Sequence, residues 1–423
     1  QAVQEEVFKG LIENAQHTTF GKKYQFADIT NYDQYRERVP IFTYETLFPY
    51  IQKLMRGEQN VLWPSEIKWF SKSSGTTNQR SKFIPVSLEA LQECHFKGGK
   101  DLISIYVNNY ADSKLFDGKG LSIGGSHQIN EYDSSASSYY GDVSAVIMQN
   151  LPPWAQFIRT PSLETALLSN WEEKIEKMAM ETASVNVTNI AGVPTWTVLL
   201  IQRIVEQEKK NNILEVWPNL EAFFHGAVAF KPYRNLFESL IPRREMRYWE
   251  TYNASEGFFG LQDQKNSEEL LLMLDYGIFY ELVPVEELEK ENPKAIRLGD
   301  VEVGKNYAMI ISTNAGLWRY NIGDTIKFTS VSPYRIKITG RTKHFINAFG
   351  EEVIIENAEA AITRACEQTN AVIDNFTAAP VFLEKGKRGG HEWIIEFKVR
   401  PVDLGKFSHI LDETLREINS DYD

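Results

Sequence analysis

The sequence has few cysteines and histidines, and neither residue type is clustered. Its two cysteines, Cys94 and Cys366, cannot build a disulfide framework or a multi-cysteine zinc site. The 7 histidines are spread along the chain without the spacing of metal ligands, so we expect no structural metal. Low cysteine usage is typical of proteins in reducing compartments, and we therefore expect a cytoplasmic protein.

Long apolar runs are also absent. No stretch reaches the roughly 18 apolar residues that a membrane-spanning helix needs, and the start of the chain lacks the basic-then-apolar pattern of a signal peptide. Positive charge is not in excess, because 45 Lys and Arg against 57 Asp and Glu give a net charge of −12. A surface of that sign repels a phosphate backbone. We expect neither a membrane nor a nucleic acid as partner, and the oligomeric state stays open.

What the sequence does contain is typical of a globular α/β protein. It has 423 residues, of which 43% are apolar, and this length is too great for a single hydrophobic core. Strand-like runs alternate with helical patterns, and strand follows strand over 270–337. We predict a large N-terminal domain, residues 1–339, of mixed sheets with flanking helices and a β-barrel-like portion. A smaller C-terminal α+β domain, residues 340–423, is predicted to follow.

The spacing of apolar residues predicts the main helices, and prolines predict where they end. In the helical region 32–56, Pro40 and Pro49 predict interruptions. Strands are predicted at 220–224 and 245–251, and the segment 251–257 follows the second of them. Helices are predicted elsewhere at 3–15, 88–106, 171–180 and 196–209.

A run of small and hydroxyl residues is the most informative stretch. It reads Ser73-Ser74-Gly75-Thr76-Thr77-Asn78-Gln79-Arg80-Ser81-Lys82. The backbone N–H groups, hydroxyls and closing cations of such a loop can wrap the oxygens of a polyphosphate. It is not a Walker A sequence, and a solvated loop is the alternative interpretation.

Three further segments carry side chains suited to nucleotide binding. In 251–257, Tyr252 offers a ring for a base, and Glu256 offers a carboxylate for Mg²⁺. Asp324 follows a glycine turn and can accept hydrogen bonds from a ribose diol. Basic residues in 340–347 lie at the predicted domain boundary. Each segment taken alone also fits an ordinary turn or linker.

One segment spells the pattern of a hydrolase nucleophile. Gly120-Leu121-Ser122-Ile123-Gly124 matches G-x-S-x-G, which in hydrolases leads from a strand into a helix. The residues that follow, 125–130, show no helical periodicity. A strand end beside an acyl substrate is therefore the better interpretation. The pocket for that substrate is predicted to include Ser126, His127, Val193 and Phe258, although ordinary packing is the alternative for each.

In their order along the chain, the motifs resemble those of the acyl-adenylate-forming (firefly luciferase-like) superfamily, and most closely the auxin-responsive acyl acid–amido synthetases. That family's phosphate loop, S-S-G-T-[ST]-x-G-x-x-K, is similar to residues 73–82, with Gln79 in place of the usual glycine. Residues 252–257 and 320–324 resemble the second and third motifs. The third motif has one residue more than the tightest family form. Residues 340–343 match the hinge pattern G-R-x-[DK], and the resemblance covers nearly the whole chain.

The resemblance implies an ATP- and Mg²⁺-dependent ligase and a role for each motif residue. Thr76, Lys82, Glu256 and Lys343 would be catalytic, and Glu256 would also bind Mg²⁺. The ATP site would comprise Ser73, Ser74, Gly75, Thr76 and Thr77 at the phosphates, Gly226, Ala227 and Tyr252 at the adenine, Asn253, Ala254 and Ser255 beside them, and Asp324 with Arg341 at the ribose.

The implied reaction joins a carboxylic acid to an amino acid. The acid would attack the α-phosphorus of ATP, expel pyrophosphate and form an acyl-adenylate, from which the amine would displace AMP. Because an anion approaches an anion, positioning and cationic neutralisation are the main catalytic tasks. In this superfamily the small domain closes between the two steps, and many members supply a lysine from it. Here Lys343 is a candidate hinge residue, and the usual lysine is expected either unrecognised within the chain or beyond Asp423.

Two alternatives to an amido synthetase remain open at this stage. An acyl-CoA ligase shares the adenylation step and passes the acyl group to a thiol. A non-catalytic nucleotide-binding homologue is suggested by Gln79 and by the unplaced lysine. The residues identify neither the acid nor the amine.

Overall fold

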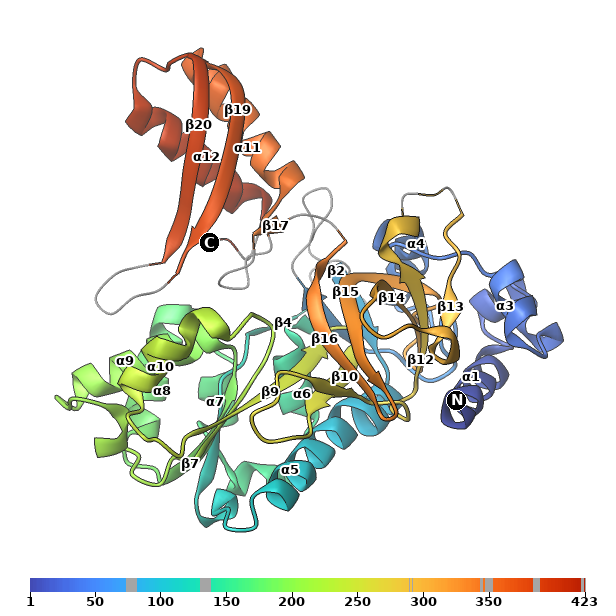
Figure 1. The fold of residues 1–423 in the computed structure, drawn as a ribbon, viewed down its shortest axis with the longest axis horizontal. Helices are drawn as coiled ribbons and strands as arrows, with labels where there is room; N and C mark the ends of the chain where they lie inside the picture. The colour runs from blue at the N-terminus through green and yellow to red at the C-terminus, as the bar shows by residue number, and fades with distance from the viewer. Residues whose placement is uncertain are drawn as a thin grey trace.

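The predicted mixed α/β class is confirmed by a computed structural model of the chain. The structure describes residues 1–73, 82–129, 138–288, 290, 292–342, 345–346, 353–382, 389–419 and 422. Figure 1 shows one large body of strands and helices, with the C-terminal elements grouped together beyond it. No helix in the described part of the chain is long and apolar enough to cross a membrane.

A 12-stranded sheet runs through the large body. Its strands are β3 (Lys119–Ser122), β6 (Arg159–Thr160), β7 (Val187–Gly192), β8 (Ala222–His225), β9 (Arg247–Ala254), β10 (Gly257–Gln262), β11 (Leu270–Leu272), β12 (Ile278–Pro284), β13 (Ile296–Arg297), β14 (Asn306–Thr313), β15 (Tyr320–Val331) and β16 (Tyr334–Arg341). Their order is β13-β12-β14-β15-β16-β11-β10-β9-β8-β7-β3-β6. Strands β6, β3, β7, β8 and β9 pair in parallel, and pairing is antiparallel from β9 onward.

Helices cover both faces of the parallel half, as parallel sheets require. On one face, Leu121, Ile190 and Phe223 share a core with helices α8 and α9. On the other face, Phe224 meets Tyr106 of α5 edge-to-face, with ring centroids 5.2 Å apart. The helical segments of this region are η2 (Ala90–Phe96), α5 (Lys97–Asn109), η3 (Leu115–Asp117), α6 (Val143–Asn150), η4 (Pro153–Phe157), α7 (Leu163–Ala166), α8 (Trp171–Thr182), α9 (Pro194–Gln207), η5 (Ile213–Glu215), η6 (Lys231–Tyr233) and α10 (Arg234–Leu240).

The N-terminal helices pack against the antiparallel half through a buried ion pair. Arg319 donates from Nη2 to Oε1 of Glu281 at 2.8 Å and from Nε to Oε2 at 3.0 Å, and both side chains are almost fully buried. Nη1 of Arg319 also donates to the carbonyl of Val39 at 2.7 Å, and Tyr32 donates to Glu281 at 2.8 Å. The segments of this region are α1 (Ala2–Ala15), α2 (Thr19–Lys23), η1 (Phe26–Asp28), α3 (Tyr32–Arg38), α4 (Tyr44–Met55), η7 (Val285–Glu287) and η8 (Leu298–Asp300).

The predicted helix break at Pro49 is wrong. Helix α4 continues through this proline, whereas α3 ends at Arg38, just before Pro40. Pro49 lies on the exposed side of α4, where water can replace the backbone hydrogen bond that proline cannot donate. A reciprocal cap between Thr43 and Thr46 also stabilises the start of α4.

A smaller four-stranded sheet lies beside the large one, in the order β2-β1-β5-β4. Strands β1 and β2 form a hairpin in which Ser73 is opposite Lys82. Residues 74–81 of the predicted phosphate loop fall between them and lie outside the described residues. The strands are β1 (Trp69–Ser73), β2 (Lys82–Val86), β4 (His127–Ile129) and β5 (Tyr139–Gly141).

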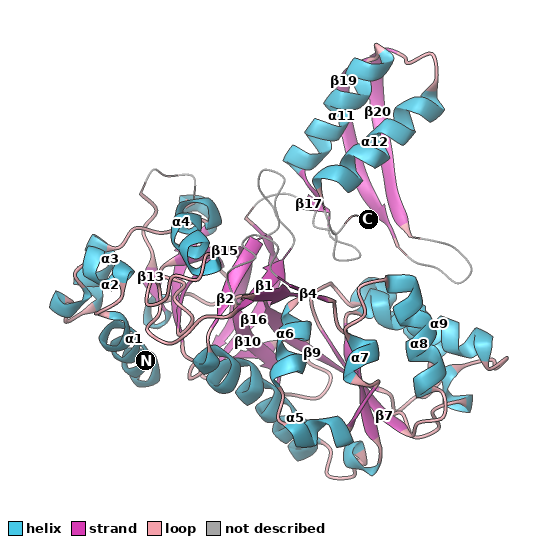
Figure 2. Cartoon of the chain, turned by 180° about the vertical axis from the view of Figure 1, so that it is seen from behind, coloured by secondary structure: helices cyan, strands magenta, loops and turns pink. Residues whose placement is uncertain are grey.

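The C-terminal elements have a hydrophobic core of their own. Ile362 and Ala365 pack with Phe407 and Leu415, beneath a two-stranded sheet. Figure 2, seen from behind, shows the two helices of this unit side by side against its long strands. The elements are β17 (Phe345–Ile346), β18 (Val353–Ile354), α11 (Ile355–Thr369), β19 (Val372–Val381), β20 (Gly390–Val399) and α12 (Leu404–Ile418).

Candidate functional site

The second predicted motif forms a tight hairpin, and the strand predicted at 245–251 continues to Ala254. Tyr252, Asn253 and Ala254 belong to β9, and β10 begins at Gly257. Only Ser255 and Glu256 form the turn between the two strands. Because β9 alternates its side chains between faces, Tyr252 points into the core while the turn presents Glu256 at the strand end. Ligands of open α/β sheets bind at this end of the strands.

Asp324 and Arg341 are brought together by strand register. They are directly opposite each other in the antiparallel pair β15 and β16. Nε of Arg341 lies 2.7 Å from Oδ1 of Asp324. The hydroxyl of Tyr252 donates to the other carboxylate oxygen, Oδ2. Burial and the nearby Asp324 charge raise the pKa of Tyr252 well above its ordinary value, so the phenol remains the donor.

Glu256 lies within the electrostatic reach of three charged residues of the predicted site. Burial raises the pKa of its carboxyl group, and Asp324 contributes in the same direction. The positive charges of Lys82 and Arg341 oppose that rise. Tyr320 is fully buried close to Glu256, and its hydroxyl has no hydrogen-bond partner among the described residues. Residues from three other segments, β2, β15 and β16, therefore converge around one carboxylate.

The predicted adenine segment begins where β8 ends. Gly226 packs so closely that an added Cβ would lie 2.5 Å from the carbonyl oxygen of Thr251. Thr251 in turn donates to the carbonyl of His225 at 3.2 Å. Ala227 has a φ of 70°, a left-handed conformation that is uncommon for residues other than glycine. These contacts fix the backbone of 226–227 beside the second motif.

Part of the predicted site lies outside the described residues. This applies to Ser74, Gly75, Thr76, Thr77 and Lys343, and of His127 only the backbone is described. Ser73 and Lys82, on either side of residues 74–81, are paired across the β1–β2 hairpin. Lys82 is 8% exposed. Their roles, like those of the other predicted site residues, stay predictions.

A π-helical segment, η2, packs behind the second motif. Nδ1 of His95 lies 3.2 Å from Oδ1 of Asn253, and burial lowers the pKa of His95 to about 4, so its ring is neutral at pH 7. The backbone N–H of Phe258 donates to Sγ of Cys94 at 3.1 Å. An added Cβ on Gly98 would lie 2.7 Å from the Phe258 ring. Short π-helical turns often occur at functional sites, and the sequence did not reveal this one.

A buried lysine, Lys174, forms hydrogen bonds with the backbone of the glycine-rich segment that follows β3. Lys174 of α8 donates from Nζ to the carbonyls of Gly124 and Gly125. The backbone N–H of Ser126 donates to Oδ2 of Asp142 at 2.9 Å. Sequence analysis missed Lys174, although its spacing from Trp171 and Met178 places it on the buried side of the helix. The next described element after β3 is the short strand β4 rather than a helix, in agreement with the rejection of the hydrolase interpretation.

The predicted pocket residues Ser126, Val193 and Phe258 belong to three different strand ends. Ser126 follows β3, Val193 follows β7 and directly precedes α9, and Phe258 lies at the start of β10. Val193 accepts the first helical hydrogen bonds of α9 through its carbonyl, from Thr197. These three positions come from separate strand ends, and their common pocket stays a prediction.

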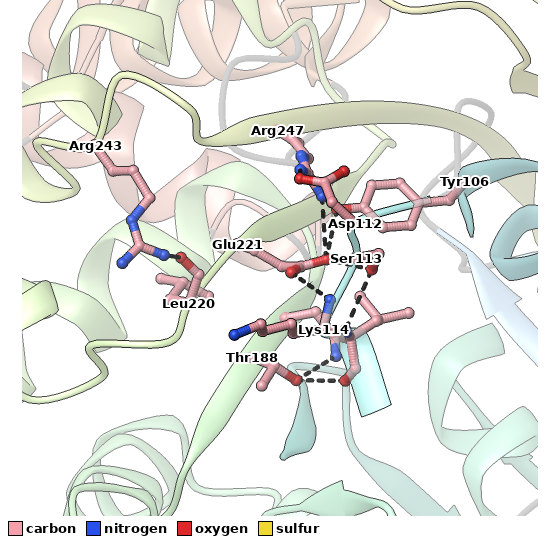
Figure 3. Close-up of polar contacts among 11 residues, drawn as sticks. Tyr106, Asp112, Ser113, Lys114, Thr188, Leu220, Glu221, Arg243 and Arg247 are labelled. Carbon is pink, nitrogen blue, oxygen red and sulfur yellow. Dashed lines mark hydrogen bonds and ion pairs between the residues drawn. The ribbon is translucent and has the colours of Figure 1, made fainter. Parts of the chain in front are cut away.

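The opposite ends of the parallel strands are closed by a polar network (Figure 3). Glu221, just before β8, accepts from the hydroxyl of Tyr106 at 2.9 Å and from the backbone N–H of Lys114 at 2.9 Å. Arg247, at the start of β9, lies 3.4 Å from Glu221 and 2.8 Å from Asp112. Since every one of these groups is engaged, this end of the sheet has a structural role.

Three family models match the chain. They are the GH3 family N-terminal domain over residues 1–246, the GH3 family central domain over 271–341 and the GH3 family C-terminal domain over 356–423. The indole-3-acetic acid-amido synthetase GH3.3 of Arabidopsis thaliana is 24% identical over an alignment of 387 residues that covers 77% of this chain and 64% of that protein. The jasmonoyl–L-amino acid synthetase JAR4 of Nicotiana attenuata is 22% identical over 393 residues, covering 77% of this chain and 66% of that protein. The chain thus spans just under two thirds of the length of these relatives.

Solved structures of similar fold include the GH3.15 acyl acid amido synthetase, with a TM-score of 0.68 at 15% identity, covering 99% of this chain and 81% of that one. A 2-hydroxyisobutyryl-CoA ligase in its thioesterification state has a TM-score of 0.60 at 12% identity, covering 99% of this chain and 84% of that one. At such identities the likeness shows the shared fold alone.

Proposed function

Because the chain belongs to the GH3 family, we propose that it is an ATP-dependent ligase that activates a carboxylic acid as an acyl-adenylate and conjugates it to an amino acid. The curated relatives that it resembles are amido synthetases of indole-3-acetic acid and jasmonate. The observation that carries the proposal is the convergence of Lys82, Glu256, Asp324 and Arg341, from four separate segments, at one end of the sheet.

Asp324 is the proposed ribose ligand. A carboxylate offers about four lone-pair positions, and Arg341 and Tyr252 take one on each oxygen. The remaining positions suit the two hydroxyls of a ribose. Tyr252 is 6% exposed, so its contribution is to orient Asp324, and the backbone of 226–227 is the proposed support for the adenine.

Lys82 and Glu256 are proposed to act at the phosphates. Lys82 supplies positive charge where an acyl carboxylate approaches the α-phosphorus, and the repulsion between these anions is the main barrier. A Mg²⁺ ion bound with the triphosphate would neutralise further charge on its oxygens. Glu256 fits such an ion, since Mg²⁺ on nucleotides is usually held by one or two carboxylates and the phosphates themselves.

The proposed reaction has two steps, each of which forms one bond and breaks another. A carboxylate oxygen bonds to the α-phosphorus as pyrophosphate leaves, and the amine nitrogen then bonds to the acyl carbon as AMP leaves with that oxygen. We also propose that the elements beyond residue 340 form a small domain that moves between the steps, with Lys343 near the hinge. The separate hydrophobic core of these elements supports that division.

ATP–pyrophosphate exchange across a panel of aryl and alkyl carboxylic acids tests the proposal. We expect exchange that depends on the acid, followed by amide formation when amino acids are added. Exchange with no acid in a broad panel, measured on the full-length natural protein, would contradict the assignment. Formation of a thioester with coenzyme A and of no amide would reassign the protein to acyl-CoA ligases.

A further inference from the structure

A buried histidine holds one polar side chain of the second motif. His95 of η2 is 5% exposed, and its Nδ1 lies 3.2 Å from Oδ1 of Asn253 on β9. An amide oxygen can only accept a hydrogen bond, so this pair requires the proton of the imidazole on Nδ1. Burial lowers the pKa of His95 to about 4, and the ring is therefore neutral at pH 7 with a single N–H donor. That donor is committed to Asn253.

The contact leaves the other half of the Asn253 amide unused. Asn253 is half-buried, and its Nδ2 has no hydrogen-bond partner among the described residues. Nδ2 is not one of the buried atoms without a partner, so solvent reaches it. The amide is planar, and it cannot turn while its oxygen accepts from His95. Two N–H donors are thus held in one orientation near the end of β9.

The strand register places this donor on the face of the hairpin that is predicted for the acid. Asn253 is opposite Phe258 across β9 and β10, and residues directly opposite each other share a face of the sheet. Phe258 is one of the predicted pocket residues. The neighbouring Tyr252 points to the other face, where its hydroxyl donates to the proposed ribose ligand Asp324. The Asn253 amide therefore lies beside the predicted acid pocket, on the side of the hairpin away from the ribose ligand.

The acid needs a donor near this position in both steps of the proposed reaction. Glu256, the proposed ligand of the magnesium ion, is in the turn of the same hairpin, three residues beyond Asn253. One carboxylate oxygen of the acid attacks the α-phosphorus. The second becomes the carbonyl oxygen of the acyl-adenylate and gains negative charge again when the amine attacks. A donor that is already oriented toward this oxygen stabilises both states.

We propose that Nδ2 of Asn253 donates a hydrogen bond to the second carboxylate oxygen of the acid, and that His95 is the positioning residue that keeps the amide in this orientation. The inference rests on the proposed ligase function and adds the group that recognises the reacting carboxylate. It also reassigns Asn253, which the resemblance to the family places beside the nucleotide, to the acid.

Replacement of Asn253 by aspartate separates this role from a structural one. An aspartate still accepts from His95, so a purely structural contact predicts little change. Its outward oxygen cannot donate, and its charge repels a carboxylate. We would measure ATP–pyrophosphate exchange with benzoate, hexanoate and the most active acid of the panel. Asn253→Asp should lower kcat/KM for the acid about 10- to 100-fold, the range for a lost hydrogen bond to a charged group, and leave KM for ATP nearly unchanged.

A matched control makes the same charge change at another acceptor. Oδ1 of Asn31 accepts from the backbone N–H of Gln34 at 3.0 Å and caps helix α3. Aspartate is an equally good cap, so Asn31→Asp should keep full exchange activity. Exchange by Asn253→Asp that equals exchange by Asn31→Asp would overturn the inference and leave the ligase function standing.

Variants of His95 test the positioning role. His95→Leu removes the donor and frees the amide to rotate, which should lower kcat/KM for the acid about 3- to 10-fold. In His95→Asn the amide nitrogen is bonded to Cγ, as Nδ1 is in histidine, so this variant should recover part of the loss. Equal losses in the two variants, with KM for ATP raised as much as KM for the acid, would contradict the positioning role.

Binding without turnover separates failure of this inference from failure of the ligase function. Calorimetry in the presence of α,β-methylene ATP, which cannot release pyrophosphate, would compare benzoate with benzyl alcohol. We expect the wild type to bind benzoate more tightly and Asn253→Asp to lose this preference. That result would support the role of Asn253 even if no acid supports exchange. A wild type without any preference for benzoate, or an equal preference in both proteins, would overturn the inference.

Discussion

Replacement of Asp324 by asparagine tests the role of the paired carboxylate. In the proposed site two ribose hydroxyls donate to a charged acceptor that Arg341 and Tyr252 hold in place. Hydrogen bonds to charged groups contribute about 1.5–3 kcal/mol each, so two of them give about 3–6 kcal/mol. Asp324→Asn should therefore lower kcat/KM for ATP by about 10²- to 10⁴-fold in the exchange assay.

The chain offers a matched control for this variant. Asp263 pairs with Arg335 at 2.6 Å, and its side chain is 15% exposed, against 12% for Asp324. Arg335 lies on β16, the same strand as Arg341, yet the Asp263 pair is remote from the motif residues. Asp263→Asn should keep full exchange activity. Equal losses in both variants, or exchange within a few-fold of wild type in a folded Asp324→Asn protein, would refute the assignment.

Three further variants probe the surroundings of the site. Gly98→Ala should raise KM for the acid in steady-state kinetics, because the new methyl group would crowd the ring of Phe258. Gly99→Ala is the control, since its Cβ would meet nothing within 4 Å, and it should leave KM unchanged. Burial lowers the pKa of Lys174 to about 8, so the unfolded chain binds more protons between pH 8 and 10. Wild-type stability should then rise in that window by up to about 3 kcal/mol relative to Lys174→Met, as denaturant titrations at the two pH values would reveal. Arg319→Met should cost about 3–5 kcal/mol in the same titrations because it leaves Glu281 buried and unpaired, and a loss below 1 kcal/mol would contradict that reasoning.

The convergence of the site could be anticipated from the sequence, but its contacts could not. The order and chemistry of the motifs predicted that Glu256, Asp324 and Arg341 would meet. The bond between Asp324 and Arg341 depends on the register of β15 and β16, which is shifted by irregularities near Thr325 and Phe328. Such bulges could not be predicted from the local sequence. The burial of Tyr252 likewise follows from strand alternation in β9, which extends three residues beyond the predicted end of that strand at Thr251.

Partners distant in sequence were the least predictable features. Arg319 is part of the third motif region, yet its carboxylate partner is 38 residues away and its carbonyl partner Val39 is 280 residues away. Lys174 has a local signal, because a lysine on the apolar side of a helix must reach a polar group.

Transfer of oxygen from the acid to AMP tests the central claim most directly. In the proposed reaction a carboxylate oxygen of the acid bonds to the α-phosphorus and leaves with it. An acid labelled with ¹⁸O in its carboxylate should therefore yield AMP that carries one ¹⁸O atom, detected by mass spectrometry after conjugation to an amino acid. Unlabelled AMP, or label recovered in inorganic phosphate alongside ADP, would contradict acyl-adenylate formation by this protein.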